Sequence, residues 1–154
     1  MSLHDSSRGL TAALVLAQTL AVVYTTGFVW TLQLMDYPMV ARLREGASES
    51  YMAAHNQMFW RVLAPGLLVA GVTSVLLVLN RSRAVPLRAA LVTLVLLILI
   101  MTLSGVVATP DRVDLAQHFS AAVHAHLIRV SWIRTVAFTA WSGLDAWLAW
   151  RLMR

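Results

Sequence analysis

Four long apolar runs determine what this chain of 154 residues can fold into. Each run approaches or exceeds the roughly 20 residues that an α-helix needs to cross the hydrocarbon core of a bilayer. The runs cover about 10–35, 52–79, 86–108 and 124–150. Only 12% of the residues are charged, whereas soluble domains carry about 25%. The sequence therefore predicts a single all-α, multi-pass integral membrane domain over residues 1–154.

The links between the runs are short, which favours antiparallel neighbours and an up-down transmembrane four-helix bundle. Pro38 restricts the backbone of Tyr37, so the first helix is expected to end there. Pro65–Gly66 predicts a kink in the second run, and the small glycine lets a neighbouring helix approach closely. The sequence Thr-Pro-Asp at 109–111 predicts an N-cap, a first-position proline and a first-turn acid. A helical extension is therefore expected before the fourth run and continuous with it.

The distribution of arginine predicts the orientation of the bundle. All twelve basic residues are arginine, and the net charge is +5. Those in the two termini and the second link are Arg8, Arg81, Arg83, Arg88, Arg151 and Arg154; those in the other two links are Arg42, Arg44 and Arg112. Cytoplasmic segments are richer in arginine, so both termini are predicted to face the cytoplasm of a bacterial inner membrane. The positive charge then suits anionic lipid rather than nucleic acid, and Asp145, near the inner end, is expected to meet Arg151 or the headgroups.

Histidines at the outer ends of two helices form the first candidate site. Topology places His55 and His124 at the same level, with Tyr51 and Gln33 near them. Two histidines from facing helices can ligate haem or one transition-metal ion. They can equally hydrogen-bond each other, a carbonyl or a carboxylate. The sequence contains no cysteine, which excludes thiolate ligands, and no paired Glu-x-x-His motif, which disfavours a di-iron bundle.

A second set of residues forms candidate contacts with lipid or with a partner protein. Arginine side chains reach headgroups from within a membrane helix, and tryptophan concentrates at membrane interfaces. On one continuous helix, His118, His126 and Arg129 would share an outward face, while His124 would point inward. The candidate contacts are His118, His126, Arg61, Arg129, Arg134, Trp132 and Trp141.

Short motifs spread over almost the whole chain carry a resemblance to a known family. They are Trp30, Gln33, Tyr37-Pro38, Tyr51, His55, Pro65, Pro110, His124 and the sequence SWIRT at 131–135. This pattern resembles a bacterial family of small four-span integral membrane proteins of no established activity, and more loosely the anthrone-oxygenase-like proteins, at the level of fold alone. The family pattern has histidines where this chain has Met52 and Arg112. If those histidines bind a metal in the family, two ligands are missing here.

Three functions follow from these observations, in order of preference. The first is a non-catalytic accessory subunit, or a component that binds lipids or partners in a membrane complex, with other membrane subunits or a second copy as partners. The alternative is a membrane oxidoreductase or oxygenase that uses haem, a metal or a quinone near His55 and His124. The third is an oligomeric transporter or channel. The short links, the featureless third run and the missing ligands favour the first.

Overall fold

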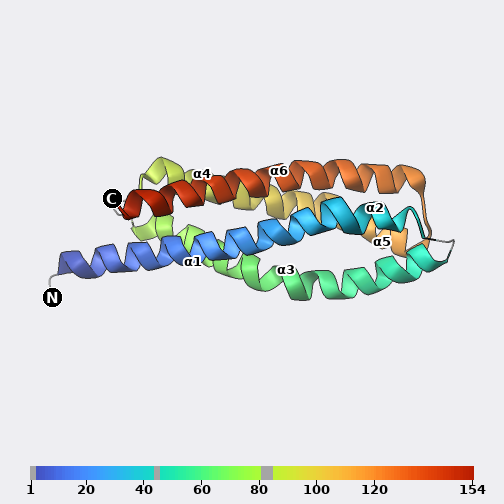
Figure 1. Ribbon diagram of the computed structural model, residues 1–154, viewed down its shortest axis with the longest axis horizontal. Coiled ribbons are helices and arrows are strands. Elements are labelled where there is room, and N and C mark those ends of the chain that lie inside the picture. The colour runs from blue at the N-terminus through green and yellow to red at the C-terminus, as the bar shows by residue number, and fades with distance from the viewer. Residues whose placement is uncertain (1–2, 44–45, 81–84) are drawn as a thin grey trace.

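The computed structural model describes residues 3–43, 46–80 and 85–154, and every secondary-structure element there is a helix (Figure 1). Three of the arginines that predict the orientation, Arg44, Arg81 and Arg83, lie outside the described residues. The helical elements in chain order are α1 (Leu3–Thr31), η1 (Leu32–Asp36), α2 (Tyr37–Val40), α3 (Ala47–Asn80), α4 (Leu87–Thr102), η2 (Leu103–Ala108), α5 (Thr109–Gln117) and α6 (Ala121–Leu152). Here η1 and η2 are π-helical.

These elements form four long columns that lie side by side in an up-down bundle. The columns are α1–η1–α2, then α3, then α4–η2–α5, and finally α6. Figure 1 shows successive columns running in opposite directions, with both termini at one end of the bundle. The column that begins with α1 packs against α3 and α6, and α4 also contacts both of these helices. The predicted helical bundle is confirmed. We call the end with the termini proximal and the opposite end distal.

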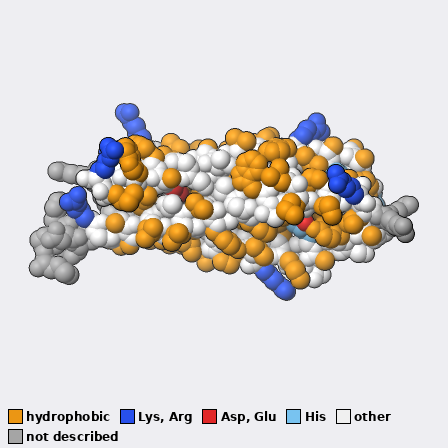
Figure 2. Space-filling model, viewed as in Figure 1, with side chains coloured by type: hydrophobic (Ala, Val, Ile, Leu, Met, Phe, Trp, Pro, Cys, Tyr) orange, Lys and Arg blue, Asp and Glu red, His pale blue; other side chains and the backbone are white. Residues whose placement is uncertain are grey.

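Three of the columns are long and apolar enough to cross a membrane. They are Arg8–Val40, Ala47–Asn80 and Leu87–Gln117. Large hydrophobic side chains cover the face shown in Figure 2 along its length. Leu20 and Leu68 are 64% and 68% exposed, and monomeric soluble proteins rarely expose such continuous apolar surface. Hydrocarbon is the solvent that suits this surface.

The fourth column, α6, is 32 residues long but has a more polar composition than the other three. Several polar side chains along its middle are turned inward: Ser131, Arg134 and Asp145 are at most 1% exposed. Its outward side chains are largely apolar, and Ile133 and Val136 are 56% and 63% exposed. Part of the lower hydropathy of α6 thus comes from polar groups that lie inside the bundle, and the exposed ionisable residues His126, Arg129 and Arg151 lie toward its two ends.

The predicted end of the first helix at Tyr37–Pro38 is wrong. The chain continues through η1, in which the N–H of Tyr37 donates to the carbonyl of Leu32, five residues back. Pro38 then lies in the first turn of α2, where a missing N–H costs no intrahelical hydrogen bond. The first column consequently extends to Val40 and brings Tyr37 into the bundle, where it is fully buried.

Two expectations about the extension before α6 are also wrong. Thr109 does not cap a new helix, because η2 joins α4 to α5 without a break and the Thr109 hydroxyl donates to the Ser104 carbonyl at 2.8 Å. The extension is not continuous with α6 either: His118 has extended backbone angles. The helix α6 begins anew, with the Ser120 hydroxyl accepting from the N–H of Val123.

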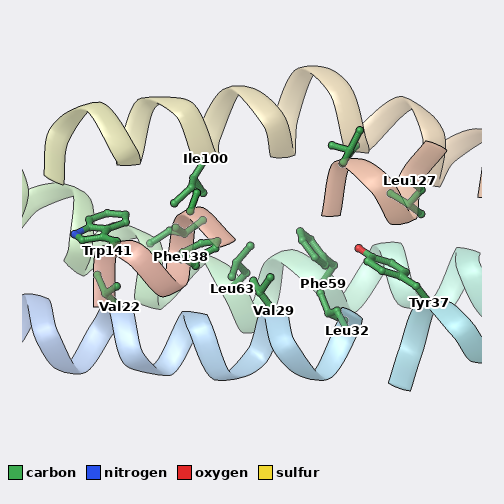
Figure 3. Packing of buried hydrophobic residues seen from close by; sticks show 14 of the residues in the cluster. Val22, Val29, Leu32, Tyr37, Phe59, Leu63, Ile100, Leu127, Phe138 and Trp141 are labelled. Atoms are coloured by element: carbon green, nitrogen blue, oxygen red, sulfur yellow. The ribbon is translucent and has the colours of Figure 1, made fainter. Parts of the chain in front are cut away.

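A continuous apolar core fills the space between the columns (Figure 3). Phe59 and Leu63 of α3 point into it together with Ile100 of α4 and Phe138 of α6, and all are at most 2% exposed. Figure 3 shows the Tyr37 hydroxyl directed toward Phe59 in the distal part of this core. Beyond Phe59, polar side chains share the interior with buried apolar ones such as Met52, Leu115 and Leu127.

Candidate functional site

The distal end of the bundle encloses a group of polar side chains drawn from all four columns. We call it the distal polar cluster. Its members are Gln33, Asp36, Tyr37, Tyr51, His55, Ser104, Thr109, Arg112, His124, Ser131 and Arg134. Both π-helical segments contribute to it, Gln33 and Asp36 from η1 and Ser104 from η2. Such segments occur often at functional sites.

His55 lies against a carboxylate. Its Nδ1 is 2.9 Å from Oδ2 of Asp36, and the hydroxyl of Tyr51 donates to Oδ1 of the same carboxylate. The imidazole ring also packs against Tyr37 and Phe59, with ring centroids 6.0 and 5.6 Å away. The contacts hold Asp36 and His55 together as a pair that links η1 to α3.

His124 has a different partner. It points inward, as predicted, is 7% exposed, and its Nε2 lies 2.7 Å from the backbone carbonyl of Tyr37. Within the described residues no hydrogen bond joins His124 to His55, and no group of three or more His, Asp or Glu side chains is arranged to hold a metal ion. His124 thus contacts a carbonyl and His55 a carboxylate, although both lie at the same end of the bundle. Gln33, the fourth residue of the candidate site, is buried with its Oε1 unpartnered.

Arg134 lies inside the bundle, so its predicted contact with lipid or a partner is wrong. Its exposed fraction is 0%. Among the described residues the guanidinium donates to hydroxyl groups alone: to Ser131 at 3.2 Å, to Tyr37 at 3.4 Å and to Ser104 at 3.5 Å. The side chain turns inward because α6 presents Ser131 and Arg134 on the same face, three residues apart. A full positive charge is therefore solvated by neutral oxygens in the protein interior.

Arg112 is the second buried arginine, although its position in a link between apolar runs did not predict burial. It is 2% exposed, its Nη2 donates to Thr109 at 2.8 Å, and its guanidinium carbon lies 3.9 Å from the centre of the Phe59 ring. The Arg134 guanidinium is 5.9 Å from the same ring. A signal was present in the sequence, since Ala108 and Leu115 lie four residues before and three after Arg112 and mark one inward helical face.

The other predicted contact residues divide between surface and interior. Five of them are exposed: His118, His126, Arg61, Arg129 and Trp132. The predicted common face of His118 and His126 does not exist, because the chain leaves the helix between them. His126 instead lies 2.7 Å from Oδ2 of Asp111.

Trp141 is buried, contrary to its prediction as a surface contact. Its exposed fraction is 0%, and its ring stacks on Phe138 with centroids 6.4 Å apart. Asp145, one turn further on, is also interior rather than near Arg151 or the headgroups. It is 1% exposed and accepts from Nε2 of Gln18 at 2.8 Å.

A lateral groove lies between α3 and α4. Its volume is about 1160 Å³. Trp60 and Arg61 form its distal end, Leu76 its proximal end, and Gly71 and Leu97 lie along it. The lining is apolar except at Arg61, and the groove opens to the side of the bundle.

No protein-family model, curated protein or solved structure matches this chain. The distal polar cluster and the α3–α4 groove are therefore the features from which its function is inferred.

Proposed function

We propose that the protein is a small, non-catalytic integral membrane protein that binds phospholipid in the α3–α4 groove, as a lipid-binding component of the bacterial cytoplasmic membrane. In this proposal α6 is a fourth transmembrane span and both termini face the cytoplasm. The distal polar cluster then lies toward the outer leaflet. Other membrane subunits, or a second copy of the chain, are the partners that such an accessory component would have. The proposal includes that the protein belongs to the family of small four-span membrane proteins that its sequence resembles.

The surface chemistry of the bundle supports this placement. The outward side of α6 is largely apolar, and its interior polar residues need no aqueous contact. At the proximal end, Arg151 and Arg154 lie over the rings of Trp147 and Trp150, with 5.0 and 3.8 Å between guanidinium carbon and ring centre. Tryptophan and arginine are enriched together at the inner membrane interface.

The observation that carries the proposal is the match between the groove and a phospholipid. From Arg61 to Leu76 the helix rises about 22 Å at about 1.5 Å per residue, which is most of a hydrocarbon core about 30 Å thick. The lining offers acyl chains an apolar surface, and the one charged group, Arg61, lies at the distal end beside Trp60. Arginine pairs well with phosphate, so a chain along the groove places its headgroup phosphate near Arg61.

Filling the groove tests this function. Gly71→Phe adds a ring in the groove, where a Cβ meets its nearest side-chain atom, in Leu97, at 3.7 Å. Gly143→Phe is the matched control, because it adds the same ring to α6 where no atom lies within 4 Å of a Cβ. Native mass spectrometry after extraction in mild detergent should show phospholipid on the wild type and on G143F. About tenfold weaker retention is expected for G71F, which corresponds to about 1.4 kcal/mol.

The role of Arg61 is tested in the same measurement. Arg61→Gln removes the charged partner of the headgroup phosphate, so it should weaken retention of every phospholipid. The loss should be larger for anionic than for zwitterionic phospholipid, because the headgroup cation of the latter offsets part of the phosphate charge. Equal phospholipid retention by G71F and the wild type would contradict binding in the groove.

A further inference from the structure

The charge balance of the distal polar cluster is incomplete. Arg112 and Arg134 are both buried, yet the ion pairs among the described residues are His55–Asp36 and His126–Asp111. Neither pair includes an arginine. Two positive charges in the interior therefore have no carboxylate at ion-pair distance in the described part of the chain.

The neighbouring acids are occupied elsewhere. Asp36 is held by His55 and by the Tyr51 hydroxyl. Glu49 accepts from the hydroxyl of Ser48 and from the backbone N–H of Phe119, at 2.9 Å each. Of the two acids on α5, Asp111 lies beside His126, as described, and Asp114 is exposed. Asp36, Glu49 and Asp111 thus already have partners, and Asp114 lies at the surface and forms no ion pair with either arginine in the described part of the chain.

Both guanidinium groups also carry an unused donor inside the protein. Nη1 of Arg112 and Nε of Arg134 are buried without a hydrogen-bond partner. Because both groups lie against Phe59, at 3.9 and 5.9 Å from its centre, their carbons are within about 10 Å of each other. Like charges this close repel in a medium of low dielectric, and charged groups within a bundle normally pair with one another or with another group.

We propose that Arg112 and Arg134 bind one phosphate group inside the distal end of the bundle, separately from the lipid in the α3–α4 groove. A phosphate monoester or inorganic phosphate carries about −1.5 to −2 charges near pH 7 and several acceptor oxygens, so a single group can face both guanidiniums. A carboxylate offers one charge and two oxygens. The hydroxyls of Tyr37, Ser104 and Ser131, which already surround Arg134, add neutral donors at the same place.

The local backbone is built to hold this pair of arginines. In η2, the Thr109 hydroxyl donates to the Ser104 carbonyl and accepts from Nη2 of Arg112. The same segment directs the Ser104 hydroxyl to Arg134. Arg112 lies on α5, a helix of nine residues that the extended residues near His118 separate from α6. Displacement of this one short helix gives a phosphate access to both arginines from the distal surface.

Binding of phosphate by the full chain tests the inference. Protein in an uncharged detergent is titrated with potassium phosphate, with potassium chloride at equal ionic strength as the reference, and the thermal midpoint is followed by tryptophan fluorescence. In a second arm, nanodiscs of phosphatidylcholine are compared with nanodiscs that also contain phosphatidic acid or phosphatidylglycerol. A saturable upward shift with inorganic phosphate assigns the site to the free anion. A shift with phosphatidic acid alone assigns it to the terminal phosphate of a lipid.

The variants separate the site from general charge effects. Arg112→Gln and Arg134→Gln should each weaken the response about tenfold or more, as expected for loss of a charge-assisted hydrogen bond. Arg129→Gln is the matched control, because Arg129 is an exposed arginine on the same helix as Arg134. G71F should leave the response unchanged, so that loss of groove binding and loss of this site are distinguishable.

Two results would overturn the inference: no saturable response beyond the chloride reference in either arm, or R112Q and R134Q responding as R129Q does. If the glutamine variants do not fold, Tyr37→Phe and Ser104→Ala keep both charges and remove hydroxyl donors. Both should then weaken the response, and an unchanged response in these variants would equally overturn the inference.

Discussion

Phe59→Ala is expected to lower the free energy of unfolding by about 3–5 kcal/mol, the usual cost of removing a buried aromatic side chain. Phe59 is 2% exposed and stands where the apolar core meets the distal polar cluster. Its ring packs against His55 and covers the Arg112 guanidinium. The substitution therefore opens a cavity and strips a buried cation of its aromatic contact. Reversible unfolding in mixed micelles measures the change.

Phe59→Leu separates these two contributions. Leucine retains most of the buried apolar surface but offers no π-face to a cation, an interaction of about 0.5–2 kcal/mol. We expect F59L to lose about 1–2 kcal/mol, which lies between the wild type and F59A. A loss below about 1 kcal/mol for F59A would show that Phe59 does not organise the junction between core and cluster.

Gly66→Leu is the second substitution with a large expected effect, a loss of about 3 kcal/mol or more. A Cβ at Gly66 would lie 2.6 Å from Cγ2 of Thr25 and 2.9 Å from Cδ1 of Tyr24. The predicted close approach at Gly66 is therefore present between α1 and α3. Any side chain there forces these helices apart along their long interface, and the hydrogen bond from the Tyr24 hydroxyl to the Val62 carbonyl at 2.8 Å is strained with them.

Two alanine substitutions, Gly66→Ala and Gly143→Ala, compare the loss of stability at a crowded glycine with that at an open one. G66A should cost about 1–3 kcal/mol. G143A meets no atom within 4 Å and should be neutral or stabilising by up to about 1 kcal/mol, because alanine favours a helix over glycine. If the G66A protein were as stable as the G143A protein, that result would contradict the close packing of α1 on α3.

The sequence predicted the architecture well because hydrocarbon-length apolar runs leave few alternatives. The spans near 52–79 and 124–150 correspond closely to α3 (Ala47–Asn80) and α6 (Ala121–Leu152). The inward position of His124 also followed from helical spacing, and it is confirmed. These features depend on periodicity along one helix, which a sequence carries by itself.

The parts that could not be predicted depend on contacts between columns. From the sequence, Pro38 predicts the end of a helix and Thr109 the beginning of one. In the structure the helix continues through both positions, because the π-helical segments η1 and η2 precede them. Arg134 was expected to reach the lipid headgroups or a partner, whereas its guanidinium is held inside the bundle by hydroxyl groups from three columns. The sequence left open whether His55 and His124 meet or instead bind a carbonyl or a carboxylate. It could not show that Asp36 takes the first and the Tyr37 carbonyl takes the second, because both partners lie on another column.

The central claim is that the bundle crosses the membrane four times, with its distal end outside. Because the sequence lacks cysteine, single-cysteine variants report the side of the membrane without background. Ser50→Cys and Ala122→Cys place a thiol on the exposed distal surface, and Met153→Cys places one at the exposed proximal end of α6. In intact bacterial spheroplasts, a membrane-impermeant maleimide should label S50C and A122C, and M153C only after permeabilisation. Labelling of A122C and M153C from the same side would show that α6 does not cross the membrane and would contradict the claim.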